Sequence, residues 1–448
     1  MKKLLLIAVI GLGIISCTTQ KTKKQMNLPN DWKHTTNIYE VNIRQYTQEG
    51  TFKAFIKEMP RLKAMGVKTL WMMPITPIAQ EKKKGSMGSP YAAENYTAIN
   101  PEFGTLDDFK TLVKEAHRLG LNVIIDWVAN HTGWDHVWTK THPEYYLHNA
   151  DGSFHAAEGM DDIIELDYKN PELRNAMIDA MKFWIKETDI DGFRCDLASW
   201  VEVDFWQQAR PEVETIKPLF WLGEFDELEN PEYGKVFDAS YSWTWMHKTK
   251  DYYDGKISLQ NLKDLLYQYS SIGDQSMRAW FTSNHDENSW NGTEYEKYGL
   301  IAKPLAVFSA TWNGVPLMYS GQELPNLKRL KFFDKDPIEW NGNYQLADFY
   351  KTLFQLKSSN PALRGGDAQV QTFMVKTNAD DKVLAYLRKN GDKEVLVLLN
   401  MSKNPVDLTI QDGMVSGDFT NVFTKENRNF DHDKNIHLDT SGYLVFQK

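Results

Sequence analysis

Cysteine is nearly absent from this chain of 448 residues, which contains only Cys17 and Cys195. That count excludes a zinc or redox centre built from several thiolates, so stability has to come from an apolar core rather than from cross-links. A concentrated stripe of lysine and arginine is also missing beyond Gln25, and the formal net charge is −9. Because basic side chains supply most of the affinity for phosphate backbones, a nucleic-acid partner is not expected.

Long hydrophobic runs are missing as well. The longest apolar segment, residues 4–15, follows Lys2 and Lys3, and it is too short to cross a bilayer, which takes about 20 helical residues. A short apolar segment behind two lysines is typical of a secretory signal. Its end, Ile14-Ile15-Ser16-Cys17, resembles a bacterial lipobox, in which the cysteine becomes the lipidated first residue of the mature protein.

We therefore predict a lipoprotein signal peptide over residues 1–17, with Cys17 as the lipid-bearing residue, and a linker over residues 18–34. An ordinary signal peptide or a short buried helix is the alternative for the apolar segment. The stretch after Cys17 reads Thr-Thr-Gln-Lys-Thr-Lys-Lys and holds no acidic cluster, which favours the periplasmic face of the outer membrane over the cell surface. We expect a monomer in the cell envelope that meets the membrane only through this lipid anchor.

Short β-rich apolar runs alternate with longer amphipathic stretches between residues 35 and 364, a pattern typical of βα units around a parallel sheet. Eight such units match a (β/α)8 barrel with insertions, because an unadorned barrel takes about 250 residues. The predicted strands are 37–42, 67–73, 122–126, 192–196, 219–224, 236–239, 279–283 and 315–319, and the clearest predicted helices are 105–119, 171–187, 259–269 and 345–357.

Two regions break this alternation. Residues 131–168, after the third predicted strand, are rich in His, Asp, Gly and Tyr with little helical period, and we expect a small excursion domain over the barrel mouth. From residue 365 to residue 448, apolar or alternating segments lie between Gly, Asn and Asp turns, which predicts an antiparallel β domain. The expected fold class is therefore an α/β TIM barrel with a short excursion after strand 3 and a C-terminal antiparallel β domain.

Acidic residues stand at the ends of several predicted strands. Asp126, Asp196 and Glu224 each close an apolar run, and Asp286 follows the run 279–283. Barrel enzymes place their catalytic groups at the C-terminal ends of the strands. Any one of these acids could instead be the N-cap of the next helix, but several carboxylates at one mouth favour catalysis, since repulsion keeps one of them protonated near neutrality.

Four segments resemble, in order and spacing, the signature segments of the α-amylase family of glycoside hydrolases. They are 126–131 (Asp-Trp-Val-Ala-Asn-His), 192–196 (Gly-Phe-Arg-Cys-Asp), 223–224 (Gly-Glu) and 284–286 (Asn-His-Asp), and weaker likenesses lie at 88–91, 165–167 and 314–323. The resemblance covers about residues 35–360. It implies a retaining hydrolase that cleaves α-glucosidic bonds, α-1,4 above all, in starch or malto-oligosaccharides by double displacement.

The resemblance also implies a role for each strand-end acid. Asp196 would be the nucleophile, Glu224 the general acid/base and Asp286 a stabiliser that grips sugar hydroxyls as the oxocarbenium-like state forms. Arg194 lies two residues before Asp196, so both side chains lie on the same face of a strand, where the guanidinium can orient Asp196 and keep it ionised.

Further residues are assigned to substrate binding by the same likeness. His131 and His285 would donate or accept hydrogen bonds with hydroxyls of the ring that is cleaved, and Tyr91 would stack on that ring. The alternatives are structural histidines and a tyrosine that packs in a loop. Cys195 alternates with Asp196 along its strand and is expected to pack in the core without a catalytic role.

Metal dependence is a separate question, because the resemblance implies no cofactor for the chemistry itself. Asn130 matches a position that often ligates a structural calcium ion in the family. Oxygens of Asp161, Asp162 and Asp167 could complete such a site, although acids of this kind are also found as solvated loop residues or caps.

Two departures from the family pattern concern specificity. Residues 197–200 read Leu-Ala-Ser-Trp and lack the Lys-His pair that many starch-degrading members present to the acceptor side, and residues 92–96 lack the Asp that commonly precedes the tyrosine. Both differences weaken an assignment as an endo-acting amylase. The alternatives are an exo-acting α-glucosidase or transglycosylase of the same family and a carbohydrate-binding protein that has lost catalysis.

Overall fold

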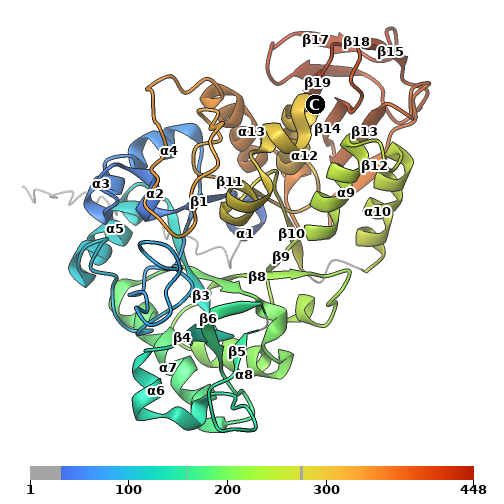
Figure 1. The fold of residues 1–448 in the computed structure, drawn as a ribbon. Helices are drawn as coiled ribbons and strands as arrows, with labels where there is room; N and C mark the ends of the chain where they lie inside the picture. Colours follow the sequence, from blue (N-terminus) through green and yellow to red (C-terminus); the bar gives the residue numbers. More distant parts are fainter. Residues whose placement is uncertain (1–31, 158, 273–275) are drawn as a thin grey trace, which may run out of the picture. The chain divides into compact units, whose positions relative to one another are not determined.

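Eight parallel strands form a closed barrel in the computed structural model, which describes residues 32–157, 159–272 and 276–448 (Figure 1). Their order around the barrel is β1-β11-β10-β9-β8-β7-β3-β2. The predicted (β/α)8 barrel is thereby confirmed. The strands are β1 (Ile38–Val41), β2 (Thr69–Met72), β3 (Asn122–Val128), β7 (Gly192–Asp196), β8 (Phe220–Asp226), β9 (Ala239–Tyr241), β10 (Met277–Trp280) and β11 (Val315–Tyr319).

Two of the eight strands differ clearly from their predicted bounds. Strand β9 begins at Ala239 rather than at Val236. Val236 and Phe237 are buried although they precede the strand, and the Phe237 ring packs against Trp206 and Trp221. Strand β10 ends at Trp280, so the run that was predicted to continue to residue 283 leaves the ladder early. Burial therefore indicated core residues correctly but not the ends of the hydrogen-bonded strands.

Three of the four predicted helices begin at side-chain caps, and the one predicted over residues 345–357 begins at Ala347 without one. Helix α5 (Leu106–Arg118) starts with a capping box between Thr105 and Asp108, and α7 (Pro171–Thr188) starts with Pro at its first turn behind the Asn170 cap. No helix within the described ranges is long and apolar enough to cross a membrane. The remaining α-helices are α1 (Trp32–Thr35), α2 (Ile43–Tyr46), α3 (Phe52–Ile56), α4 (Met59–Met65), α6 (Val137–Thr141), α8 (Val203–Val213), α9 (Trp243–Tyr253), α10 (Leu259–Ser271), α11 (Glu294–Tyr298), α12 (Ala302–Thr311) and α13 (Ala347–Ser359).

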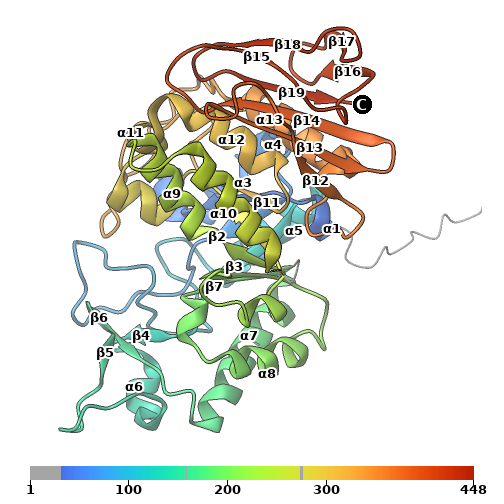
Figure 2. The same ribbon diagram turned by 90° about the vertical axis from the view of Figure 1, so that its right-hand side faces the viewer.

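A small antiparallel sheet follows β3. Strands β4 (His131–Gly133), β6 (Met160–Glu165) and β5 (Ala156–Ala157) pair in that order, and α6 lies beside them (Figure 2). The first residue of β4 is His131, which pairs in register with Glu165 at the end of β6. This segment therefore leaves the barrel directly from the strand end that carries the first signature segment.

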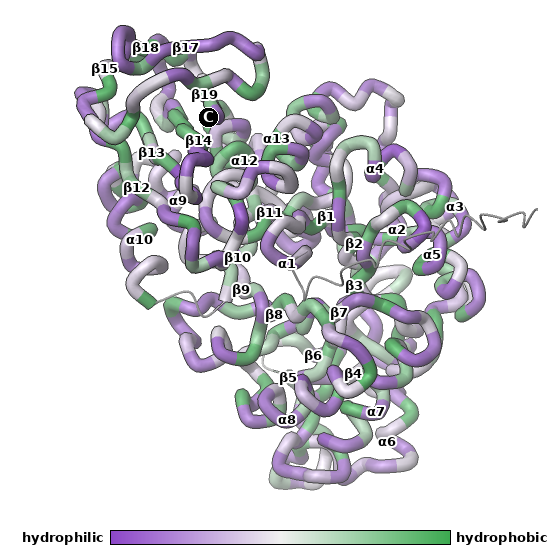
Figure 3. Tube along the Cα trace, turned by 180° about the vertical axis from the view of Figure 1, so that it is seen from behind, coloured by the Kyte–Doolittle hydropathy of each residue, from purple (hydrophilic) through white to green (hydrophobic). Residues whose placement is uncertain are grey.

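The C-terminal part is an antiparallel β structure, as predicted. Side chains alternate along β13 and β14, so Leu384 and Tyr386 join the core cluster of the barrel, whereas Ala385 and Leu387 belong to a second cluster on the other face of the sheet. Figure 3 shows hydrophobic residues along both strands. The strands are β12 (Gln371–Met374), β13 (Val383–Asn390), β14 (Lys393–Asn400), β19 (Tyr443–Gln447), β16 (Asp418–Asn421) and β17 (Asn427–Asn429) in one sheet, with β15 (Val406–Thr409) paired to β18 (Asn435–Leu438).

The predicted signal peptide, its Cys17 and residues 18–31 of the predicted linker lie outside the described residues.

Candidate active site

The predicted catalytic acids lie around one cavity at the C-terminal ends of the barrel strands. Asp196 is the last residue of β7, Glu224 lies near the end of β8, and Asp286 directly precedes the short π-helix Glu287–Asn291 that follows β10. The cavity has a volume of about 400 Å³ and is lined by all three carboxylates together with Tyr91, His131 and His285. The structure thus brings together residues that are separated by up to 195 positions in the chain.

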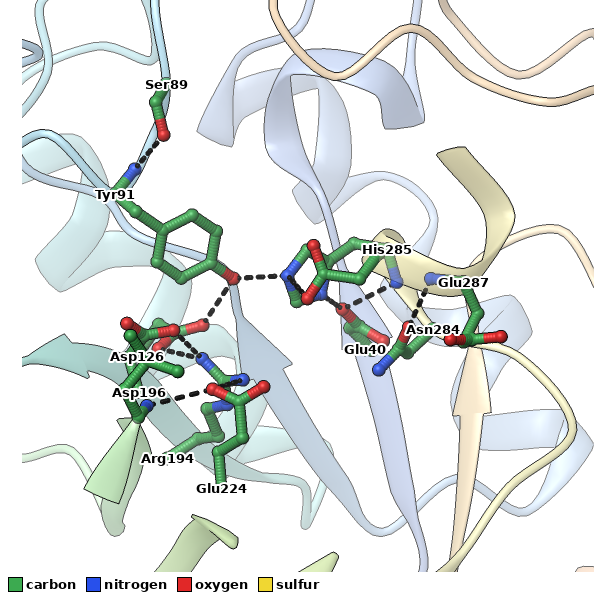
Figure 4. A network of polar contacts seen from close by, with 12 residues as sticks. Glu40, Ser89, Tyr91, Asp126, Arg194, Asp196, Glu224, Asn284, His285 and Glu287 are labelled. Atoms are coloured by element: carbon green, nitrogen blue, oxygen red, sulfur yellow. Dashed lines mark hydrogen bonds and ion pairs between the residues drawn. The ribbon is translucent and has the colours of Figure 1, made fainter. Parts of the chain in front are cut away.

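Arg194 connects three carboxylates, those of Asp126, Asp196 and Glu224 (Figure 4). Its side chain is fully buried, and one terminal nitrogen donates hydrogen bonds to Asp126 Oδ1 at 2.9 Å and to Asp196 Oδ1 at 2.8 Å. The other terminal nitrogen lies 2.8 Å from Glu224 Oε2 in an ion pair. The Glu224 oxygen also accepts a hydrogen bond from the backbone N–H of Leu197 at 2.9 Å. One buried cation therefore holds Asp196 and Glu224 at fixed positions.

A second polar network is built on His285, which contacts Glu40 and Tyr91 (Figure 4), and it reaches Asp286. His285 Nδ1 lies 2.5 Å from Glu40 Oε1, while Nε2 lies 3.1 Å from Asp286 Oδ2 and 2.8 Å from the Tyr91 hydroxyl. The Tyr91 hydroxyl in turn donates a hydrogen bond to Asp126 Oδ2 at 3.0 Å. Burial alone would lower the pKa of His285, but the carboxylates of Asp286 and Glu40 outweigh burial and raise it, so the ring carries a positive charge.

Burial and neighbouring charges give the acids of the site different pKa values. Burial raises the pKa of Glu224 to about 7 and that of Asp196 to about 6, in both cases against the opposing effect of the Arg194 guanidinium. At Asp286 burial has the same direction, but the His285 imidazolium outweighs it and the pKa is lowered. Near neutrality the arrangement therefore combines a carboxylic acid at Glu224 with ionised carboxylates at Asp196 and Asp286.

His131 and Tyr91 present groups to the same cavity. Burial lowers the pKa of His131 to about 3, so its ring is neutral, and Nε2 has no hydrogen-bond partner among the described residues. A buried nitrogen without a partner costs free energy unless a ligand or water satisfies it. The Tyr91 ring lies nearly parallel to the His285 ring, with 5.3 Å between the centroids, and is 7% exposed.

The residues proposed for calcium do not form a suitable set of donors. The side-chain nitrogen of Asn130 lies 3.3 Å from His131 Nδ1, and the carboxylates of Asp161 and Asp162 lie 2.8 and 2.9 Å from the Lys84 ammonium. Within the described ranges, no group of three or more His, Cys, Asp or Glu side chains is arranged to hold a metal ion. Because Lys84 already neutralises Asp161 and Asp162, these two acids do not fit the calcium site that the resemblance implied.

Several residues at the site had not been identified from the sequence. Glu40 lies on β1, fully buried beneath His285, and its signal was a carboxylate inside the otherwise apolar run 38–41. Lys84, Trp290, Phe332 and Phe333 also line the cavity. Trp290 lies in the short π-helix and the other three lie in irregular segments, where no local pattern marks them.

A TIM barrel that gathers several buried carboxylates around one cavity at its C-terminal face has the architecture of a glycoside hydrolase. Comparison with known proteins assigns the family. The chain matches the family model "Alpha amylase, catalytic domain" over residues 22–155 and 142–364, and the model "Maltogenic Amylase, C-terminal domain" over residues 373–445. It belongs to the α-amylase family of glycoside hydrolases.

Individual relatives agree with this assignment. The chain is 24% identical over 415 residues to Alpha-amylase 2 of Dictyoglomus thermophilum, covering 83% of this chain and 70% of the relative. Its structure is similar to a noncanonic maltogenic α-amylase from Thermotoga neapolitana, with 29% identity, a TM-score of 0.80 and coverage of 93% and 96% of the two chains. An α-amylase from Lactobacillus plantarum is similar at 28% identity and a TM-score of 0.83, covering 93% of this chain and all of the other.

Proposed function

We propose that this glycoside hydrolase cleaves α-1,4-glucosidic bonds in starch or malto-oligosaccharides with retention of configuration, using Asp196, Glu224 and Asp286. The observation that carries the proposal is the guanidinium of Arg194, which contacts Asp196 at 2.8 Å and Glu224 at 2.8 Å in one buried cluster. Contact with a common guanidinium favours the short separation of a retaining pair, about 5–5.5 Å, over the wider spacing that an inverting pair needs for water.

In the first step, protonated Glu224 donates its proton to the glycosidic oxygen while an ionised oxygen of Asp196 attacks the anomeric carbon. The bond from that carbon to the leaving sugar breaks, and an ester bond to Asp196 forms. The raised pKa of Glu224, about 7, supplies the proton near neutrality, and Arg194 favours the anionic form of Asp196. Carboxyl groups carry out both events, so the chemistry needs no cofactor.

In the second step, Glu224 is a carboxylate and accepts a proton from water, whose oxygen attacks the same anomeric carbon. The ester bond to Asp196 breaks, and the released sugar has the α configuration after two inversions. Glu224 leaves this step protonated and ready for the next cycle. An acceptor sugar in place of water would give transglycosylation by the same route.

Asp286 and its neighbours would hold the ring during both steps. The His285 imidazolium, fixed by Glu40 at 2.5 Å, keeps Asp286 ionised, and the Asp286 carboxylate can then accept hydrogen bonds from sugar hydroxyls as positive charge develops on the ring. Neutral His131 offers its unpartnered Nε2 to another hydroxyl. Tyr91 would close the ring site from the side of the loop after β2.

The reaction products distinguish this proposal from its rivals. We expect that NMR of the first products from maltoheptaose shows the α-anomer before mutarotation. A β-anomeric first product, or activity undiminished in Asp196→Ala, would contradict the proposal. Turnover itself separates an enzyme from a carbohydrate-binding protein without catalysis, and the distribution of product lengths separates endo-action from an exo-acting glucosidase or transglycosylase.

We also propose that the protein is a monomer held in the cell envelope by lipid on Cys17. The support is in the sequence, where Lys2 and Lys3 precede the apolar residues 4–15 and the lipobox-like end at Cys17. Cys17→Ala should move the protein from the membrane fraction to the soluble fraction of cells that express it. Retention of that variant in the membrane fraction would contradict the anchor.

A further inference from the structure

The segments that follow the barrel strands at the mouth differ in length. Long segments follow β2, β3, β10 and β11, namely residues 73–105, 129–170, 281–301 and 320–346. By contrast, only residues 197–202 separate β7 from α8, and only Ser242 separates β9 from α9. Strands β10, β11, β1, β2 and β3 are consecutive around the barrel, and all of them except β1, which only Asn42 separates from α2, are followed by a long segment. The segment after β8, residues 227–238, is shorter than any of these four, so the long segments stand on one arc and the arc of β7, β8 and β9 stays low.

The long segments after β10, β11 and β2 contact one another. The Trp290 ring, after β10, lies 5.4 Å from the Phe332 ring and 5.7 Å from the Phe333 ring, both after β11. The backbone N–H of Met87, after β2, donates a hydrogen bond to the Phe333 carbonyl at 3.0 Å. At Gly85 there is no room for a side chain, because a Cβ there would lie 2.5 Å from the Phe333 Cβ.

Lys84 extends this contact to the excursion after β3. Its ammonium lies 2.8 Å from Asp161 and 2.9 Å from Asp162, both on β6. Asp162 is 5% exposed, whereas the Lys84 side chain is 34% exposed, so the ion pair is partly shielded from water on the side of the acid. Lys84, Asp162, Trp290, Phe332 and Phe333 all line the catalytic cavity, and we call these five residues the donor wall.

The position of the acid tells which part of a glucan faces the donor wall, an argument that depends on the proposed function. Glu224 protonates the leaving sugar, which lies toward the reducing end, and Glu224 stands on β8 in the low arc. The groups around the cleaved ring, Tyr91 and His285, come from the segments after β2 and β10 in the built-up arc. Sugar units on the non-reducing side of the cleaved ring therefore extend toward the donor wall, and the leaving chain extends over the low arc.

We propose that the donor wall closes the catalytic cavity on the non-reducing side, so that the protein removes short units of one length from the non-reducing end of α-glucans. The cavity has a volume of about 400 Å³, and ligand pockets in proteins have volumes of about 300–1,000 Å³. A pocket of this size suits a small ligand such as maltose. The exposed Trp200, at 48%, stands on the low arc after β7, where a long leaving chain has room to pass.

A blocked substrate tests this wall in the unmodified protein. Maltoheptaose with a fluorophore at the reducing end is compared with the same compound whose non-reducing glucose also carries an ethylidene group. We expect the unblocked compound to lose short units of one fixed length, one at a time. The blocked compound should react at least about tenfold more slowly, because the added group clashes with the donor wall.

Three outcomes overturn the proposal. Equal rates on the two compounds would show that the cavity is open beyond the cleaved ring. Fluorescent products of every length at early conversion would show endo-action along an open groove. No cleavage of either compound would overturn the proposed function and the wall with it, so the first two failures are distinct from the third.

Single substitutions in the donor wall provide the second test. Phe333→Ala and Lys84→Ala should each raise the ratio of blocked to unblocked cleavage, by about tenfold, because each removes part of the wall. The ratio corrects for any loss of folded protein. Lys83→Ala is the matched control, since Lys83 is exposed in the same loop and its ammonium donates a hydrogen bond to the Gln80 side chain, and its ratio should equal that of the wild type. An unchanged ratio in both wall variants would contradict the proposal.

Discussion

The two ends of the barrel each hold a cluster of charged side chains, and the clusters differ in the ratio of acids to cations. At the N-terminal end, Asp191 accepts from Lys217 at 3.1 Å and contacts His117 Nε2 at 2.8 Å, and Lys217 also binds Asp189 at 2.7 Å. At the C-terminal end, the ion pairs of the two cations Arg194 and His285 involve five acids, which are Asp126, Asp196, Glu224, Asp286 and Glu40.

This difference has opposite effects on the pKa of Asp191 at the N-terminal end and on the pKa values of Asp196 and Glu224 at the mouth, whereas Asp286, beside His285, behaves like Asp191. Burial would raise the pKa of Asp191, but His117 and Lys217 outweigh it and the pKa is lowered. At the mouth, Arg194 does not fully offset burial, and the pKa values of Asp196 and Glu224 are raised. Burial of acids is thus common to both ends, and the shortage of cations is what distinguishes a site built for proton transfer from a structural ion-pair cluster.

The largest expected effect concerns the acids at the mouth. Asp196→Asn should lower kcat/KM by about 10⁴-fold or more, because it removes the proposed nucleophile. Glu224→Gln should lower kcat/KM by about 10²–10⁴-fold, because it removes the proposed general acid. Neither substitution should lower the thermal midpoint, since each removes a charge from a cluster with excess negative charge. Initial rates on maltoheptaose and thermal denaturation measure the two quantities. A variant with wild-type activity would contradict a catalytic role of these acids. A variant that loses stability as well as activity would show that the acids at the mouth are structural, like those at the N-terminal end.

The second effect is on the pH profile of the wild type. Activity requires ionised Asp196, whose pKa is about 6, and protonated Glu224, whose pKa is about 7. The rate constant kcat/KM should therefore fall on the acid side as Asp196 gains a proton and on the alkaline side as Glu224 loses one, giving a bell-shaped curve. In Glu224→Gln the alkaline limb should disappear. A profile that stays flat from about pH 5 to pH 9 would contradict these assignments.

The third effect concerns the opposite end of the barrel. Lys217→Ala leaves Asp189 and Asp191 without their shared ammonium, and we expect a loss of about 1–2 kcal/mol in the free energy of unfolding, because Lys217 is only partly exposed. Its kcat/KM should stay at the wild-type value, as the residue lies far from the mouth. Lys110→Ala is the control, since it breaks an exposed pair with Glu187 and should cost less than about 1 kcal/mol. Loss of activity in folded Lys217→Ala would contradict the structural role.

The smallest effect is the pH dependence of stability at His117. Its hydrogen bond with Asp191 raises the pKa in the folded state. A raised folded pKa means that the stabilisation is fully present below the unfolded pKa, about 6.5, and is lost as the pH rises through the folded value. Urea unfolding of wild type and His117→Gln should therefore differ more at about pH 6 than at about pH 9. An equal difference at both values would show that His117 does not titrate as the structure indicates.

Much of the site was predictable because it depends on the ends of barrel strands. Asp196 closes an apolar run, and a parallel strand with a closed barrel around it directs that residue to the mouth. Arg194 follows from strand alternation two residues earlier. Asp286 was also predicted, although β10 ends at Trp280, because the motif 284–286 marks it independently of the strand bounds.

The rest depended on contacts that local patterns do not encode. Glu40 reaches His285 across 245 positions of sequence, and its neighbours suggested only a buried strand. The acids Asp161 and Asp162 were candidate calcium ligands, but a distant lysine in the loop after β2 turned out to neutralise them. Lys84 and Phe333 lie in irregular segments, so their place in one wall follows only from the folded chain.

The most direct test of the central claim is to identify the residue that forms the covalent intermediate. Glu224→Gln is incubated with α-maltosyl fluoride, whose fluoride leaves without help from an acid, while the second step lacks its base. The account predicts that the intact mass rises by one maltosyl group and that peptide mass spectrometry finds the group on Asp196. A maltosyl group on another residue, or fluoride release with β-maltose and no adduct, would contradict it.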